Sequence, residues 1–155
     1  ETRCAAFHQP YHQALKAELD RIRNRHGLAI LYDCHSIRSH IPHLFEGTLP
    51  DFNIGTNNGK TCASEIESTV LEICQIAEAY TTVLNGRFKG GWTTRHYGRP
   101  DEGIHVIQME LAQSTHLTAE AAPWEYSQSR AAQLRPHLAE ILQKLAETAT
   151  TLGAK

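Results

Sequence analysis

Long apolar runs are absent from this 155-residue chain. No stretch approaches the roughly 18 consecutive apolar residues that would suggest a membrane span, and the N-terminal residues have no signal-peptide pattern. An excess of one charge is also lacking, since 15 basic and 17 acidic residues leave a formal net charge of −2. That balance offers no basic patch to nucleic acid. We therefore expect a cytoplasmic protein with no membrane or nucleic-acid partner, and the sequence leaves the oligomeric state open.

Closely spaced cysteine pairs are missing as well. The four cysteines, Cys4, Cys34, Cys62 and Cys74, form no CxxC motif, which argues against a zinc ribbon and a redox motif. We expect reduced thiols. Internal repeats and low-complexity tracts are also absent, so the length favours one domain. Because the chain opens on Glu1 and enters a helical pattern at once, we expect it to begin partway through a longer protein.

Helical and strand patterns alternate along the chain. Apolar residues recur at helical spacing in residues 10–25 and 127–152, whereas residues 28–32 and 104–111 are rich in the residues of buried strands. Between them, residues 64–80 have a third helical pattern, residues 81–84 form a short strand candidate, and residues 36–61 have no sustained period. This order predicts a layered α/β domain with one long loop.

Two of the predicted strands carry functional groups near their ends. Residues 28–32 run into Asp33 and His35, and Glu110 lies near the end of the other strand, with Arg95 between them in the sequence. If the strands are neighbours, an imidazole and a carboxylate meet at one edge of the sheet. Such a set suits metal-assisted hydrolysis, in which zinc commonly has two His and one Glu ligand and a free carboxylate activates water. The alternative for His35 is a hydrogen-bonded histidine that only packs at a strand end.

Several separated motifs together resemble one known family. They are Asp33-Cys34-His35-Ser36, Ile41-Pro42, Leu49-Pro50-Asp51-Phe52-Asn53-Ile54-Gly55-Thr56-Asn57-Asn58-Gly59, Gly86-Arg87-Phe88-Lys89-Gly90-Gly91, Thr94-Arg95-His96-Tyr97-Gly98 and Gln108-Met109-Glu110-Leu111. In this order they resemble the N-formylglutamate amidohydrolases, from Pro10-Tyr11-His12 to beyond Gln113. The chain would then be the C-terminal part, residues 1–155, of a single domain of that family.

The resemblance implies a fold, a reaction and a set of site residues. The fold would be a three-layer α/β/α domain with a mixed sheet, like that of zinc carboxypeptidases and related acylases. The reaction would be zinc-dependent hydrolysis of N-formyl-L-glutamate, a small-molecule substrate, to formate and L-glutamate in histidine degradation. His35 would bind Zn²⁺ or another divalent metal, Glu110 would act as general base and acid, and Arg95 would contact the substrate. Asn57 and Tyr97 would line the pocket.

The chain departs from the family pattern in its metal ligands. In relatives the first His and Glu ligands lie upstream, and nothing before Pro10 resembles them; the local substitute is the HxxE pair His43 and Glu46. Asp33 and Ser36 would orient the imidazole of His35. Two alternatives therefore stay open. One is a hydrolase of another N-acyl or N-formimidoyl amino acid, and the other is a non-catalytic fragment without the upstream ligands.

Overall fold

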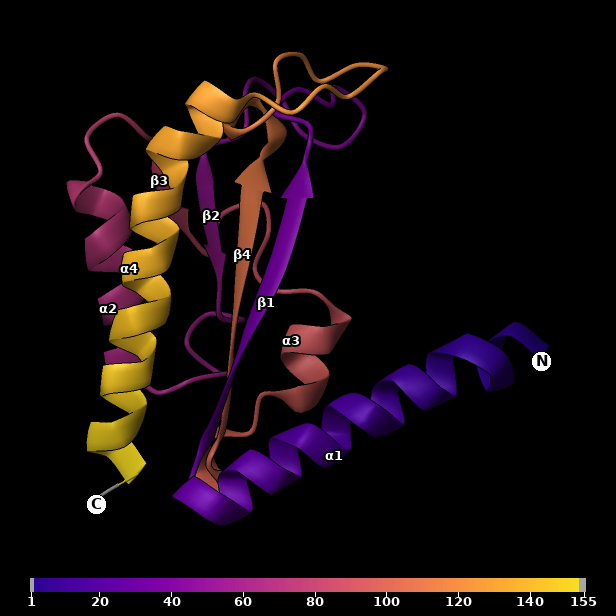
Figure 1. Ribbon diagram of the computed structural model, residues 1–155, viewed down its shortest axis with the longest axis vertical. Coiled ribbons are helices and arrows are strands. Elements are labelled where there is room, and N and C mark those ends of the chain that lie inside the picture. The colour runs from indigo at the N-terminus through magenta and orange to yellow at the C-terminus, as the bar shows by residue number, and fades with distance from the viewer. Residues whose placement is uncertain (1, 154–155) are drawn as a thin grey trace.

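The computed structural model describes residues 2–153 and shows a mixed four-stranded sheet between helices (Figure 1). The strands are β1 (Ala29–Ile37), β2 (Phe52–Gly55), β3 (Thr82–Leu84) and β4 (Ile104–Ala112). Their order across the sheet is β1-β4-β2-β3. β1 pairs parallel with β4, β2 pairs antiparallel with β4, and β3 pairs parallel with β2.

Helices cover both faces of this sheet. They are α1 (Gln9–His26), α2 (Ser64–Ile76), α3 (Trp92–Tyr97) and α4 (Gln128–Gly153), with shorter turns at Cys4–His8, Pro100–Glu102 and Gln113–Thr115. Figure 1 shows α2 and α4 together on one side of the sheet and α3 on the other. The predicted three-layer architecture is confirmed. Within residues 2–153, no helix is both long and apolar enough to cross a bilayer.

The apolar stripe of α1 explains where this helix packs. Leu15, Leu19 and Ile22 recur at helical spacing and contact the buried cluster that includes Tyr97 of α3. The helix ends at Gly27, which adopts φ +83° and donates its N–H to a carbonyl of the last turn. Glycine tolerates this left-handed conformation, and a helix end of this kind satisfies an otherwise free carbonyl. The predicted helix at residues 10–25 is thus confirmed.

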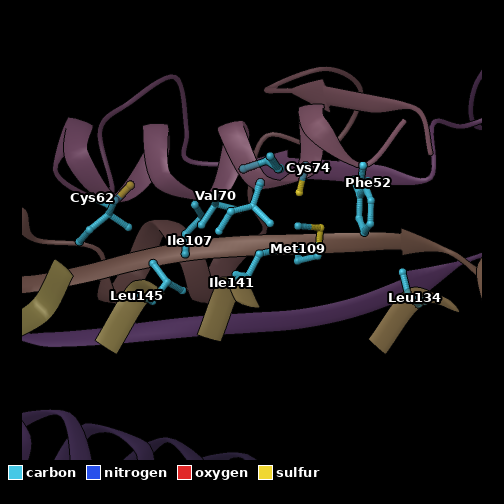
Figure 2. Close-up of a cluster of buried hydrophobic side chains, with 13 residues drawn as sticks. Phe52, Cys62, Val70, Cys74, Ile107, Met109, Leu134, Ile141 and Leu145 are labelled. Atoms are coloured by element: carbon cyan, nitrogen blue, oxygen red, sulfur yellow. The ribbon is translucent and has the colours of Figure 1, made fainter. Parts of the chain in front are cut away.

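The main core lies between the sheet and the pair α2 and α4. Ile107 and Met109 of β4 lie in Figure 2 among side chains of these two helices, such as Val70 and Ile141. Successive side chains of a strand point to opposite faces. Gln108 and Glu110 therefore lie on the other face of β4, which is the face that α3 covers.

Three elements differ from the prediction. β1 continues to Ile37, so His35 lies inside the strand and not in a loop that follows it. β2 falls within residues 36–61, which were predicted as one long loop. The strand was not predicted because Pro50, Asn53 and Gly55 are residues typical of turns. The amino group of Asn53 is nevertheless accommodated inside the sheet, since Nδ2 donates to the carbonyls of Pro50 and Glu110. Residues 92–97 lie outside the helices and strands predicted from the sequence, and they form α3.

His105 gives the fold a pH-dependent contribution to stability. Its Nδ1 accepts the N–H of Ala63, the residue just before α2, at 3.1 Å. Burial lowers the pKa of His105 from its ordinary value of 6.5, and the carboxylate of Glu65 opposes this shift. The unfolded chain then binds the proton more readily, so the free energy of unfolding is highest above pH 6.5 and decreases as the pH falls through the lower folded-state pKa.

We expect the His105→Asn variant to lose less stability on acidification than the unsubstituted protein. Asparagine retains an acceptor close to the position of Nδ1 but does not titrate. Urea unfolding at about pH 7.5 and about pH 5.5 measures the difference for each protein. An equal loss in both proteins would show that His105 does not contribute to the pH dependence.

Candidate functional site

The strand register gathers polar side chains on the face of the sheet under α3. His35 of β1 is paired with Glu110 of β4, and Asp33 is paired with Gln108. On the other side of β4, Asn53 of β2 is also paired with Glu110. Paired residues of adjacent strands point to the same face. The two strand ends that the sequence singled out are therefore neighbours.

A cavity of about 480 Å³ opens beside these residues. It is lined by residues from β1, β4, α3 and the loop of residues 86–91: His35, Arg87, Phe88, Lys89, Gly90, Gly91, Arg95, Gln108 and Glu110. Three of the predicted site residues, His35, Arg95 and Glu110, thus lie around one cavity. Their roles in binding or catalysis stay predictions.

Glu110 is the buried acid of this cavity, with 7% of its surface exposed. Its Oε2 lies 3.5 Å from Nε2 of Gln108. Loss of hydration raises the pKa of Glu110 above its ordinary range; the imidazole of His35 opposes this shift and the carboxylate of Asp33 adds to it. A carboxyl group with a raised pKa can both accept and return a proton near neutral pH.

The imidazole of His35 is held by Asp33 and remains accessible. Its Nε2 lies 3.0 Å from Oδ1 of Asp33, while 46% of its side chain is exposed. A carboxylate at one ring nitrogen orients the ring and leaves the other nitrogen for a ligand. This contact agrees with the orienting role expected of Asp33, whereas Ser36 lies on the opposite face by the alternation of the strand.

A resident metal does not fit the described residues alone. Across residues 2–153, no group of three or more His, Cys, Asp or Glu side chains is placed to hold an ion. The HxxE pair His43 and Glu46 is exposed in the loop before β2 and does not line the cavity. His35 could supply one ligand, which is fewer than the three protein ligands of a catalytic zinc site. All four cysteines are free thiols, as expected.

Basic groups surround the rest of the cavity. Nη1 of Arg95 donates to the carbonyl of Gly90 at 2.5 Å, and Nε of Arg87 donates to the carbonyl of Leu44 at 3.1 Å. Lys89 also lines the cavity, and its ammonium has no hydrogen bond or ion pair among the interactions described for residues 2–153. These cations can attract an anionic ligand.

Asn57 and Tyr97 do not line the cavity. The backbone N–H of Asn57 donates to the carbonyl of Lys89 at 2.6 Å, so the backbone of Asn57 helps to hold the loop in place. Tyr97 is buried, and its hydroxyl lies 2.7 Å from Nδ1 of His12. Their predicted contact with substrate is not seen in this arrangement, and it stays a prediction.

Sequence reasoning missed Gln108 and Lys89 as parts of the site. Gln108 is 4% exposed and lies two residues before Glu110 on the same face of β4. The signal was present, because polar residues at alternate positions of a mostly apolar strand indicate a polar patch on one face. Lys89 could not be placed, since the loop of residues 86–91 has no regular pattern.

Comparison with known proteins identifies the family. The model of the N-formylglutamate amidohydrolase family matches residues 1–117. The chain is 48% identical over 136 residues to the N-formylglutamate deformylase of Pseudomonas aeruginosa and 51% identical over 137 residues to that of Pseudomonas putida. Each match covers 88% of this chain and 51% of the relative, so the chain spans about half the length of these relatives.

A solved structure shares the fold. The crystal structure of N-formylglutamate amidohydrolase from Ralstonia eutropha JMP134 superposes with a TM-score of 0.81 at 23% sequence identity. The match covers 94% of this chain and 54% of that protein. The structural match supports the α/β fold, and the sequence matches establish the relationship. The chain belongs to the N-formylglutamate amidohydrolase family.

Proposed function

We propose that this chain contributes the acid-base and substrate-binding half of a site that hydrolyses N-formyl-L-glutamate to formate and L-glutamate, a step in histidine degradation. The observation that carries the proposal is the cavity itself, which is lined by the buried Glu110 together with the basic residues Arg87, Lys89 and Arg95. The names of the two Pseudomonas relatives support the choice of substrate.

Glu110 supplies the proton transfers of this reaction. It accepts a proton from water as the water oxygen bonds to the formyl carbon, and it returns the proton to the nitrogen as the C–N bond breaks. Formate and the free amine of glutamate result. Arg95 lines the same cavity, where its guanidinium can hold a substrate carboxylate or stabilise the developing oxyanion.

The basic rim matches the charge of this substrate. N-formylglutamate carries two carboxylates, and Arg87, Lys89 and Arg95 all line the cavity. Arg87 and Arg95 already donate to carbonyls, whereas Lys89 has no hydrogen bond among those described for residues 2–153. We assign Lys89 to the side-chain carboxylate of the substrate for this reason.

Release of the free amino acid from a substrate panel, by a longer chain that also supplies the remaining metal ligands, tests the proposal. With zinc supplied, we expect turnover of N-formyl-L-glutamate to exceed that of N-formyl-L-glutamine, which lacks the second charge, and of N-acetyl-L-glutamate. Lys89→Ala is expected to raise KM for N-formylglutamate roughly tenfold with little change in kcat, since a lost charge-assisted contact acts on binding. Lys144→Ala, on the exposed surface of α4, is the matched control. Binding without turnover would favour a non-catalytic module instead.

We also propose that His35 contributes one ligand to a zinc site, or to a site for another divalent metal, whose other ligands lie outside the described residues. In a longer chain that supplies those other ligands, the His35→Ala variant is expected to bind zinc at least roughly tenfold more weakly, because loss of a ligand costs at least as much as loss of its orienting partner. Equilibrium dialysis measures this affinity without any assay of activity. Unchanged affinity in His35→Ala, or a loss in the control His43→Ala, would contradict the assignment.

A further inference from the structure

Gln108 is a buried amide that connects two walls of the cavity. It lies in β4, and its Oε1 accepts the backbone N–H of Gly91 at 2.7 Å. Because a backbone N–H can only donate, the atom that faces it is the amide oxygen. The amino group must then face Glu110, where Nε2 lies 3.5 Å from Oε2. The chemistry of the neighbours thus fixes which way the amide is turned.

Thr94 extends this connection toward β1. Its buried hydroxyl lies 3.3 Å from Oε1 of Gln108 and 3.3 Å from Oδ2 of Asp33. The other oxygen of Asp33 lies 3.0 Å from Nε2 of His35. Because the oxygens of Asp33 and Gln108 both accept and a hydroxyl has one hydrogen, Thr94 donates to Asp33 or to Gln108 but not to both at once. Polar contacts thus connect the imidazole of His35, through Asp33, Thr94 and Gln108, to the carboxylate of Glu110.

We propose that Gln108 is a positioning residue, which holds the carboxylate of Glu110 toward the cavity and holds the loop at Gly91 against β4. Within residues 2–153, Gln108 is the one side chain with a described hydrogen bond to that carboxylate. A buried carboxylate with a single donor takes its orientation from that donor. The effect on catalysis rests on the proposed function, whereas the effect on geometry does not.

Two substitutions separate the donor of Gln108 from its acceptor. Gln108→Glu keeps an oxygen for Gly91 and Thr94 but replaces the amino group that faces Glu110. Gln108→Met keeps the length of the side chain and loses both functions. If Gln108 merely filled space, loss of its amino group alone and loss of both amide groups would have the same effect on Glu110 and on Gly91. Gln133→Glu, an exposed position of α4, makes the same chemical change far from the cavity.

The geometric half is tested in this chain by crystal structures and by amide hydrogen exchange at about pH 9, well above the ordinary range of carboxyl pKa values. In Gln108→Glu we expect Glu110 to turn away from position 108 while the N–H of Gly91 stays protected. In Gln108→Met we expect that N–H to exchange about tenfold faster. If Gln108→Met fails to fold, the structure of Gln108→Glu alone tests whether Gln108 sets the orientation of Glu110.

The catalytic half is read from kinetics. If the chain turns over N-formylglutamate, Gln108→Glu should lower kcat about 100-fold and leave KM within about threefold, because a misplaced base affects the chemical step more than binding. Absence of turnover from a longer chain that supplies the remaining metal ligands would defeat the proposed function but not the positioning role. An unmoved Glu110 carboxylate in Gln108→Glu, or an unchanged kcat in an active protein, would overturn the positioning role.

Discussion

The Glu110→Gln substitution is expected to lower kcat for N-formylglutamate hydrolysis by about 10³-fold, because general acid-base catalysis contributes on the order of 10²–10⁴ to enzymatic rates. Glutamine has the same size and can still accept from Nε2 of Gln108, but it cannot take a proton from water. KM should change little, since the positive rim that attracts the substrate remains. Steady-state release of formate measures both quantities.

The fold is expected to survive this substitution. Loss of hydration already raises the pKa of Glu110, which shows that its charge is costly at this site, and a neutral amide avoids that cost. Thermal unfolding should therefore show no loss of stability. Glu102→Gln, in the exposed turn Pro100–Glu102, is the matched control and should retain the full rate. A rate for Glu110→Gln that equals this control would assign the proton transfer to another group.

Side chains on regular elements were the predictable part of the site. The helical period of α1 and α4 and the apolar character of β1 and β4 follow from local patterns. His35 and Glu110 could be brought together from sequence because each lies near the end of such a strand. Their pairing in register, one directly beside the other, depends on β1 and β4 being adjacent. The sequence alone does not state that adjacency.

Segments held by tertiary contacts were not predictable. β2 carries Asn53, whose amide is unfavourable in an isolated strand. Its Nδ2 donates to the carbonyls of Pro50 and Glu110, whereas its Oδ1 is buried without a hydrogen-bond partner among the described residues. The loop of residues 86–91 has no period, and its position depends on hydrogen bonds to Asn57 and Gln108. In each case a hydrogen-bond partner distant in the sequence decides the local structure. Such tertiary contacts override the secondary-structure propensity of the segment itself.

Gly55 shows how closely β2 and this loop approach each other. A Cβ atom at this position would lie 2.5 Å from the backbone nitrogen of Gly90 and 2.8 Å from the carbonyl carbon of Lys89. Both are backbone atoms, so the clash cannot be relieved by a change of rotamer. The absence of a side chain at Gly55 is therefore what allows the loop to form a wall of the cavity.

The Gly55→Ala variant is expected to displace residues 86–91 and to lose activity together with stability. Overpacking of this kind costs about 1–3 kcal/mol of unfolding free energy, and a displaced cavity wall should lower kcat/KM about 100-fold.

Gly47→Ala is the matched control for Gly55→Ala, because a Cβ atom at Gly47 would meet no other atom within 4 Å and only the φ of +71° is unfavourable. That control should be destabilised by about 1–2 kcal/mol with an unchanged rate per folded molecule. Urea unfolding and formate release measure the two effects, and a Gly55→Ala protein with the full rate would show that the contact between β2 and the loop does not shape the site.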